Sequence, residues 1–136
     1  MRILLVEDDP KNVELFEAAL EAEHVVVVER DGVSGERRAL AEAFDLILLD
    51  IQLPAKNGIE VCRSLRASGM RTPIAALSAS VLPDEVAKIN AADFSRFLSK
   101  PISPSALRAA VRDLTVHHPP TQSRAAGSER ARGVAT

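Results

Sequence analysis

Apolar residues along the chain fall into short continuous runs separated by longer amphipathic segments. The second and third runs consist of valine, leucine and isoleucine without polar alternation, which is typical of strands buried on both faces of a parallel sheet. Five strands are therefore predicted, and they are Ile3–Val6, Val25–Val28, Leu46–Leu49, Ile74–Leu77 and the weaker Phe97–Leu98.

The segments between these runs show helical spacing of apolar residues. Two prolines support helix starts, because Asp9 precedes Pro10 and Ser103 precedes Pro104, and an oxygen-bearing cap before proline favours a first helical turn. The segment from Val33 to Ala43 is the least regular, because Gly35 interrupts its stripe. The other helical faces are Val13, Phe16 and Leu20; Ile59, Cys62 and Leu65; Val86 and Ile89; and Leu107, Val111 and Leu114.

Five repeats of strand and helix predict a doubly wound α/β fold with a five-stranded parallel sheet and right-handed crossovers. The 136 residues, 46% hydrophobic and 26% charged, correspond to one globular domain. We expect this domain to span residues 1–116. Residues 117–136 lack apolar periodicity and are expected to form a disordered C-terminal tail.

Composition excludes several classes of protein. A net charge of −2 provides no general basic field for nucleic acid, and the absence of Trp and Tyr removes the aromatic platforms that bind single strands. No apolar run approaches the roughly 20 residues that cross a bilayer, and no signal peptide is expected before the first strand. A single cysteine, Cys62, excludes an intrachain disulfide. Together these features favour a cytoplasmic protein.

Polar side chains follow the predicted strands at the ends where function gathers in an open α/β sheet. Acidic residues come after the first and third strands, a hydroxyl after the fourth and an ammonium after the fifth. These residues are Glu7, Asp8 and Asp9, then Asp50, Ser78 and Lys100. We expect them to converge on one edge of the sheet.

Crowded carboxylates repel each other unless a cation lies between them. Mg²⁺ (or Mn²⁺) prefers oxygen ligands and commonly bridges carboxylates to a phosphate. Lys100 and Ser78 offer a positive charge and a hydroxyl to phosphoryl oxygens. Asp50 is the candidate nucleophile, because carboxylates form aspartyl phosphates. Asp9 is expected to be a helix cap, since Pro10 follows it.

From Met1 to Leu114 the chain resembles the CheY-like receiver domains of bacterial response regulators. The resemblance lies in motifs in a fixed order: Ile3-Leu-Leu-Val-Glu-Asp-Asp9, Leu48-Leu-Asp-Ile-Gln-Leu-Pro54 with Gly58, Ala76-Leu-Ser-Ala79 and Phe97-Leu-Ser-Lys-Pro101. It implies the flavodoxin-like (βα)5 topology with strand order 2-1-3-4-5.

The resemblance also implies roles for individual residues. Glu7 and Asp8 match the acidic pair, with Asp8 a direct Mg²⁺ ligand, and Asp50 matches the phosphoacceptor. The backbone carbonyl of Gln52 matches a further metal ligand. Ser78 and Lys100 match the hydroxyl and the lysine that contact the phosphoryl group. Phe97 matches the aromatic switch position, and the Lys100–Pro101 peptide bond is expected to be cis.

Two positions depart from the family pattern. Asp93 stands where a glycine would end the fourth helix, and Glu23 stands where a glycine often ends the first. Asp adopts a left-handed backbone conformation less readily than glycine does.

A phenylalanine at position 97 gains nothing from exposure, and Ser78 leaves more room inside than threonine would. We therefore predict that Phe97 already lies mostly inward without a phosphoryl group.

The resemblance implies a single-domain response regulator that accepts a phosphoryl group on Asp50 from a histidine kinase or phosphotransfer protein. Its output would pass through protein contacts with an unidentified target, and phosphorylation-dependent dimerisation stays open. Enzymatic activity would be limited to self-catalysed phosphotransfer and autodephosphorylation. The alternative is a pseudo-receiver that binds partners without phosphorylation. A flavodoxin is disfavoured because Glu7 and Asp8 would repel its phosphate, and a haloacid-dehalogenase-type phosphatase because Gln52 stands where its second Asp is needed.

Overall fold

The computed structural model describes residues 1–79 and 82–117, and side chains as far as residue 115. Five strands alternate with five helices along these residues. The strands are β1 (Arg2–Val6), β2 (Val25–Glu29), β3 (Leu46–Asp50), β4 (Ile74–Ser78) and β5 (Arg96–Ser99). The helices are α1 (Pro10–Leu20), α2 (Gly32–Ala41), α3 (Gly58–Ala67), α4 (Pro83–Ala91) and α5 (Pro104–His117).

All strand pairs are parallel, and the sheet has the order β2-β1-β3-β4-β5. This confirms the predicted fold class and strand order. In the registers, Val6 lies beside Leu49, Asp50 beside Leu77, and Ser78 beside Ser99. Asp50 and Ser78, together with Glu7 after Val6 and Lys100 after Ser99, therefore come together at one edge of the sheet.

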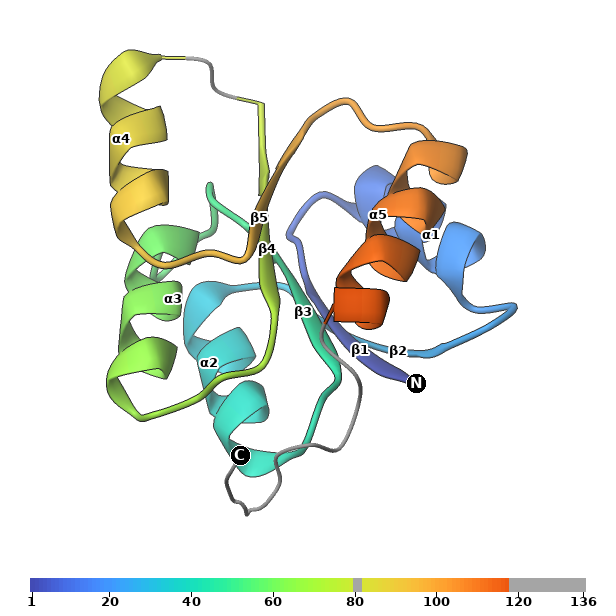
Figure 1. The fold of residues 1–136 in the computed structure, drawn as a ribbon, viewed down its shortest axis with the longest axis horizontal. Coiled ribbons are helices and arrows are strands. Elements are labelled where there is room, and N and C mark those ends of the chain that lie inside the picture. Colours follow the sequence, from blue (N-terminus) through green and yellow to red (C-terminus); the bar gives the residue numbers. More distant parts are fainter. Residues whose placement is uncertain (80–81, 118–136) are drawn as a thin grey trace.

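Helices cover both faces of the sheet (Figure 1). Helices α1 and α5 pack on one face, where Phe16 and Leu107 belong to a cluster with Leu5 and Leu48. Helices α2, α3 and α4 pack on the other face. Since every strand residue from Leu46 to Asp50 is buried, the continuous apolar runs of the sequence are explained by burial on both sides.

Helix α2 packs through small residues, which is why its apolar stripe is weak in the sequence. Gly32, Gly35 and Ala39 are its buried residues. A Cβ atom at Gly35 would lie 2.7 Å from a methyl group of Val6, so the helix lies too close to β1 for a larger side chain. The helix begins after the cap Asp31 and ends at Ala41, two residues before the predicted end.

The predicted caps of α1 and α5 are present. The Asp9 carboxylate accepts a hydrogen bond from the backbone N–H of Lys11 at 3.0 Å, and Ser103 Oγ accepts one from Ala106 at 3.1 Å. Helix α5 runs through His117, which was predicted to be the first residue of the tail. The remaining tail residues, 118–136, lie outside the described part of the chain.

Asp93 ends the α4 region in the left-handed conformation, with φ of 67°. The Arg66 guanidinium supports this turn, because it donates to the backbone carbonyl of Asp93 at 3.0 Å and to that of Thr72 at 2.8 Å. The Ser95 hydroxyl, which is also within 3.4 Å of Arg66, accepts the backbone N–H of Ile74. We call this group the Arg66 clamp: it joins α3 to the starts of β4 and β5.

Helix α1 ends differently from the expectation for Glu23. It stops at Leu20, and Glu21 caps it in the right-handed conformation. The N–H groups of Glu23 and His24 both donate to the carbonyl of Leu20, at 3.2 and 3.0 Å. Glu23 is not among the described residues with positive φ, so this turn requires no glycine.

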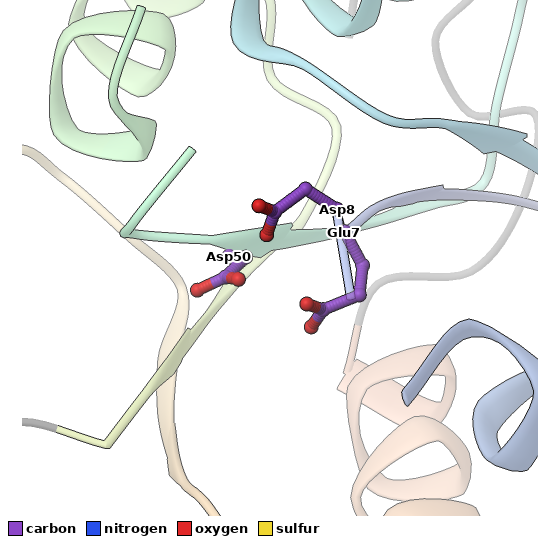
Figure 2. A group of neighbouring side chains, drawn as sticks. All are labelled: Glu7, Asp8 and Asp50. Atoms are coloured by element: carbon purple, nitrogen blue, oxygen red, sulfur yellow. The ribbon is translucent and has the colours of Figure 1, made fainter. Parts of the chain in front are cut away.

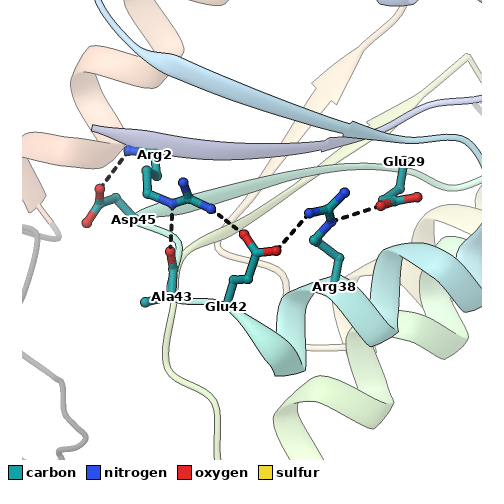
Figure 3. A network of polar contacts seen from close by, with 6 residues as sticks. All are labelled: Arg2, Glu29, Arg38, Glu42, Ala43 and Asp45. Carbon is teal, nitrogen blue, oxygen red and sulfur yellow. Dashed lines mark hydrogen bonds and ion pairs between the residues drawn. The ribbon is translucent and has the colours of Figure 1, made fainter.

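A polar network joins Arg2, at the start of β1, by way of α2 to Glu29, the last residue of β2 (Figure 3). Arg2 contacts Glu42, whose second carboxylate oxygen lies 2.7 Å from Arg38. Arg38 also binds Glu29 of β2 at 2.9 Å, and the backbone N–H of Arg2 donates to Asp45 at 2.8 Å. These contacts are half-exposed. We therefore assign them to holding β1, β2 and α2 together rather than to a functional site.

We expect Cys62 to be unreactive in the native protein. The side chain is fully buried, its thiol donates to the carbonyl of Ala92 at 3.1 Å, and burial raises its pKa to about 11. An aromatic disulfide reagent at about pH 8 should label no thiol until denaturant is added, and then one per chain. Rapid labelling without denaturant would show that α3 and α4 separate readily.

Candidate functional site

Three carboxylates meet at the carboxyl ends of β1 and β3. Glu7 and Asp8 follow β1 directly, and Asp50 is the last residue of β3. One oxygen from each lies within 4.8 Å of the others, and Figure 2 shows the three side chains turned toward one another. The convergence predicted for Glu7, Asp8 and Asp50 is therefore present.

The carboxylates differ in burial. Glu7 is 0% exposed and Asp50 is 3% exposed, whereas Asp8 is exposed to solvent. Burial, together with the charge of Asp50, raises the pKa of Glu7. The site thus holds concentrated negative charge that water does not screen on the Glu7 side.

Lys100 lies between the two buried carboxylates. Its Nζ atom is 3.2 Å from Oε1 of Glu7 and 3.2 Å from Oδ2 of Asp50. Burial by itself lowers the pKa of Lys100, but attraction to Asp50 and Glu7 outweighs it and the pKa is raised. Lys100 therefore stays protonated and balances part of the negative charge.

Ser78 and Lys100 are held next to each other by the ends of β4 and β5. Ser78 is 1% exposed, and its carbonyl accepts the backbone N–H of Lys100 at 2.8 Å. The peptide bond from Lys100 to Pro101 is cis. The hydroxyl and the ammonium predicted from the sequence thus reach the same edge as the carboxylates.

Backbone N–H groups orient two of the carboxylates. Gln52 donates to Oδ1 of Asp50 and Asp9 donates to Oε2 of Glu7, each at 3.2 Å. The Asp9 side chain itself caps α1, as predicted, and lies outside the carboxylate group. Both donors lie in loops that follow strands, so loop position decides where these oxygens point.

Phe97 lies on β5 beside Ala76 and is half-buried. Its ring packs against the cluster beneath α2, α3 and α4, which includes Ala76 and Leu49. The ring is therefore neither exposed to solvent nor fully enclosed. Its role as a switch stays a prediction.

The donor set fits a hard divalent cation. Three carboxylates face one ammonium, so a second positive charge is needed to balance the group, and all the side-chain donors are oxygens. Mg²⁺ prefers such ligands and binds through a few carboxylates while keeping water. Asp8, the exposed member, leaves the group open on the solvent side.

The loop after β3 also carries a contact that the sequence motifs did not indicate. Lys56, in the loop between β3 and α3, binds Glu36 of α2 and Ser64 of α3. In the sequence Lys56 is only a lysine between Pro54 and Gly58, and periodicity does not distinguish it from a surface charge.

Comparison with known proteins identifies the class. The response regulator receiver domain family matches residues 3–112, which is most of the chain. The chain belongs to this family, and it is a CheY-like receiver domain of two-component signalling. Receiver domains are signalling modules in phosphorelays and are typically not enzymes. They interact with histidine kinases and phosphotransfer proteins.

Among individual relatives, the response regulator PmrA of Pseudomonas aeruginosa is 38% identical over 117 residues, 85% of this chain. The same alignment covers 52% of PmrA, so the chain spans about half the length of that relative. The two-component response regulator ORR41 of Oryza sativa subsp. japonica is 39% identical over 108 residues, which cover 76% of this chain and 85% of ORR41.

A similar solved structure is the receiver domain of a sensor histidine kinase from Pseudomonas aeruginosa PAO1. It is 34% identical, covers 85% of this chain and 94% of that one, and has a TM-score of 0.75. That structure has a magnesium ion coordinated in its active site cleft.

In the present chain, none of the helices in the described part has the length and hydropathy to cross a lipid bilayer.

Proposed function

We propose that this receiver domain is switched by phosphorylation of Asp50 with Mg²⁺, and that it signals through protein contacts as a single-domain response regulator. One observation carries the proposal. The Asp50 carboxylate is nearly buried, lies beside Glu7 and Asp8, and has the Lys100 ammonium at 3.2 Å. A carboxylate in this setting is oriented by the backbone N–H of Gln52 and has part of the surrounding negative charge balanced by the ammonium.

The residues divide the chemistry between them. An Asp50 oxygen forms a bond to phosphorus while the bond from phosphorus to the imidazole nitrogen of a donor histidine breaks, and the electron pair leaves with that nitrogen. Lys100 neutralises charge on the transferred oxygens. Mg²⁺ held by Glu7, Asp8, Asp50 and the Gln52 carbonyl supplies further positive charge when bound.

The switch follows from the neighbouring strands. The Ser78 hydroxyl donates to a phosphoryl oxygen, and its movement leaves space that the half-buried Phe97 ring fills. The balance between two existing states then shifts, and the surface of α4, β5 and α5 changes for a partner protein. Chemistry is limited to self-catalysed phosphotransfer and hydrolysis of the phosphoaspartate. The donor is a histidine kinase or phosphotransfer protein in the cytoplasm.

The proposal is tested by incubating the purified chain with Mg²⁺ and acetyl phosphate and reading the product by intact mass spectrometry. We expect one added phosphoryl group, and none with Asp50→Asn or with EDTA. No addition to the wild-type chain, combined with no stabilisation by the phosphoryl mimic beryllofluoride, would contradict the proposal. The chain would then be a pseudo-receiver that binds partners without phosphorylation.

A further inference from the structure

We infer that Lys56 is a positioning residue for the metal site: its ammonium, held by Glu36 and Ser64, fixes the loop between β3 and α3 and thereby raises the affinity for Mg²⁺. The inference rests on the proposed function, because it assumes that Mg²⁺ binds beside Asp50. None of the sequence motifs assigns Lys56 a role.

The Lys56 ammonium joins three parts of the fold. Its Nζ atom lies 2.5 Å from a carboxylate oxygen of Glu36 on α2 and 2.9 Å from the hydroxyl of Ser64 on α3. The side chains of Lys56 and Glu36 are 29% and 21% exposed, so both are mostly withdrawn from water. The loop is thus tied to the two helices on either side of it.

The loop needs such ties because its backbone is strained. Ala55 has φ of 72°, a left-handed conformation that a Cβ atom disfavours. The N–H of Lys56 donates to the carbonyl of Pro54 at 2.8 Å, which closes the turn around Ala55. The N–H of Gly32 donates to the same carbonyl at 3.2 Å, so α2 holds the turn by main chain as well. A strained turn persists only where its surroundings fix it.

Loop position matters at the metal site because Gln52 belongs to the same loop. Its N–H donates to Oδ1 of Asp50, and its carbonyl is the proposed ligand to Mg²⁺. If the Lys56 anchor is lost, Ala55 can relax toward ordinary φ values, and the residues from Gln52 to Asn57 sample more conformations. Ordering them again then opposes metal binding, and the affinity for Mg²⁺ falls.

A merely structural role for the ion pair predicts something different. Breaking it would lower the unfolding temperature equally with and without metal, and the Mg²⁺ concentration for half-maximal stabilisation would not move. The decisive quantity is therefore the metal midpoint rather than stability itself.

We would titrate Mg²⁺ against the thermal unfolding midpoint of the full chain, followed by circular dichroism, and repeat the titration by calorimetry. Lys56→Met should raise the Mg²⁺ concentration for half-maximal stabilisation about threefold or more. Glu36→Gln, which breaks the pair from the other side and keeps the lysine, should raise it as well. The exchanged pair Lys56→Glu with Glu36→Lys should recover part of the loss.

Arg96→Met is the matched control. It removes an ion pair of similar length, 2.7 Å from Arg96 to Asp113, on β5 and α5. Its Mg²⁺ midpoint should equal that of the wild type.

The outcomes separate the two proposals. A wild-type chain that Mg²⁺ does not stabilise contradicts the metal site of the proposed function. A wild-type chain that responds to Mg²⁺, with Lys56→Met and Glu36→Gln sharing its midpoint, overturns the positioning role and leaves the proposed function intact. If Lys56→Met does not fold, Glu36→Gln decides alone.

Discussion

Replacing Lys100 with methionine should cost the metal-free protein about 3 kcal/mol of unfolding free energy near neutral pH. The ammonium lies 3.2 Å from both Glu7 and Asp50, and both carboxylates are almost completely buried. Methionine fills a similar volume but leaves two buried charges without a counterion. Urea unfolding followed by circular dichroism measures the loss, and Mg²⁺ should restore part of it because it supplies positive charge to the same carboxylates.

The loss should depend on pH in a defined direction. Burial and Asp50 already raise the pKa of Glu7, and removal of the ammonium raises it further. As the pH falls through this raised pKa, Glu7 becomes protonated in the folded variant and the repulsion disappears. The difference from the wild type should therefore be largest near neutral pH and shrink on acidification. A difference that grew toward acid would contradict the charge argument.

Lys100→Met should also slow phosphorylation of Asp50 by acetyl phosphate about a hundredfold or more, since the ammonium no longer neutralises the transferred group. Lys88→Met is the matched control, because Lys88 is an exposed lysine of α4 outside the site. It should leave both stability and the phosphorylation rate unchanged. Phosphorylation of Lys100→Met at the wild-type rate would remove Lys100 from the proposed mechanism.

Gly58→Ala should destabilise the protein by about 2 kcal/mol and misplace the phosphoacceptor. A Cβ atom at Gly58 would lie 2.2 Å from the carbonyl oxygen of Asp50 and 2.9 Å from Cα of Ile51. These are main-chain atoms that cannot rotate away. The N–H of Gly58 also donates to the carbonyl of Ile51 at 2.9 Å. Relief of the clash therefore requires the end of β3 to move.

The control is Gly69→Ala, at the end of the α3 region. Gly69 has φ of 94°, but a Cβ atom there would meet nothing within 4 Å. The variant should lose about 1 kcal/mol through backbone strain and keep the wild-type phosphorylation rate. Both variants are compared at a temperature where circular dichroism shows them folded. A normal phosphorylation rate in folded Gly58→Ala would mean that Asp50 tolerates a shifted backbone.

The sequence was most informative where burial is uniform. Runs such as Leu46–Leu49 predicted strands because both faces of the sheet are covered, and that pattern does not depend on distant partners. The apolar stripe of helix α2 is weak for a physical reason: Gly35 lies close to Val6 of β1 and Ala39 is buried, and such small residues form no marked apolar stripe. Asp93 was identified as unusual, but its compensation by Arg66 joins residues 27 apart in the sequence.

The place where the site residues meet was predictable because parallel strands end at one edge, whereas their roles stay predictions. Glu7, Asp8, Asp50, Ser78 and Lys100 needed only the strand order to be brought together. Lys56 was missed because its partner Glu36 lies 20 residues away on another helix. Whether such a lysine contacts water or a carboxylate is decided by how α2 packs on the loop, and no local pattern records that.

The Arg66 clamp fixes β4 and β5 at the end where both strands start. It holds the starts of both strands and the turn at Asp93, whereas Ser78 and Lys100 lie at their opposite ends. Because the clamp fixes that end, we expect a rearrangement of this region to be smallest beside Asp93. Helix α4 begins at Pro83, on the side of Ser78, and returns toward Asp93. If Ser78 moves as the proposed function requires, we therefore expect the Leu82 end of α4 to be displaced more than the Asp93 end.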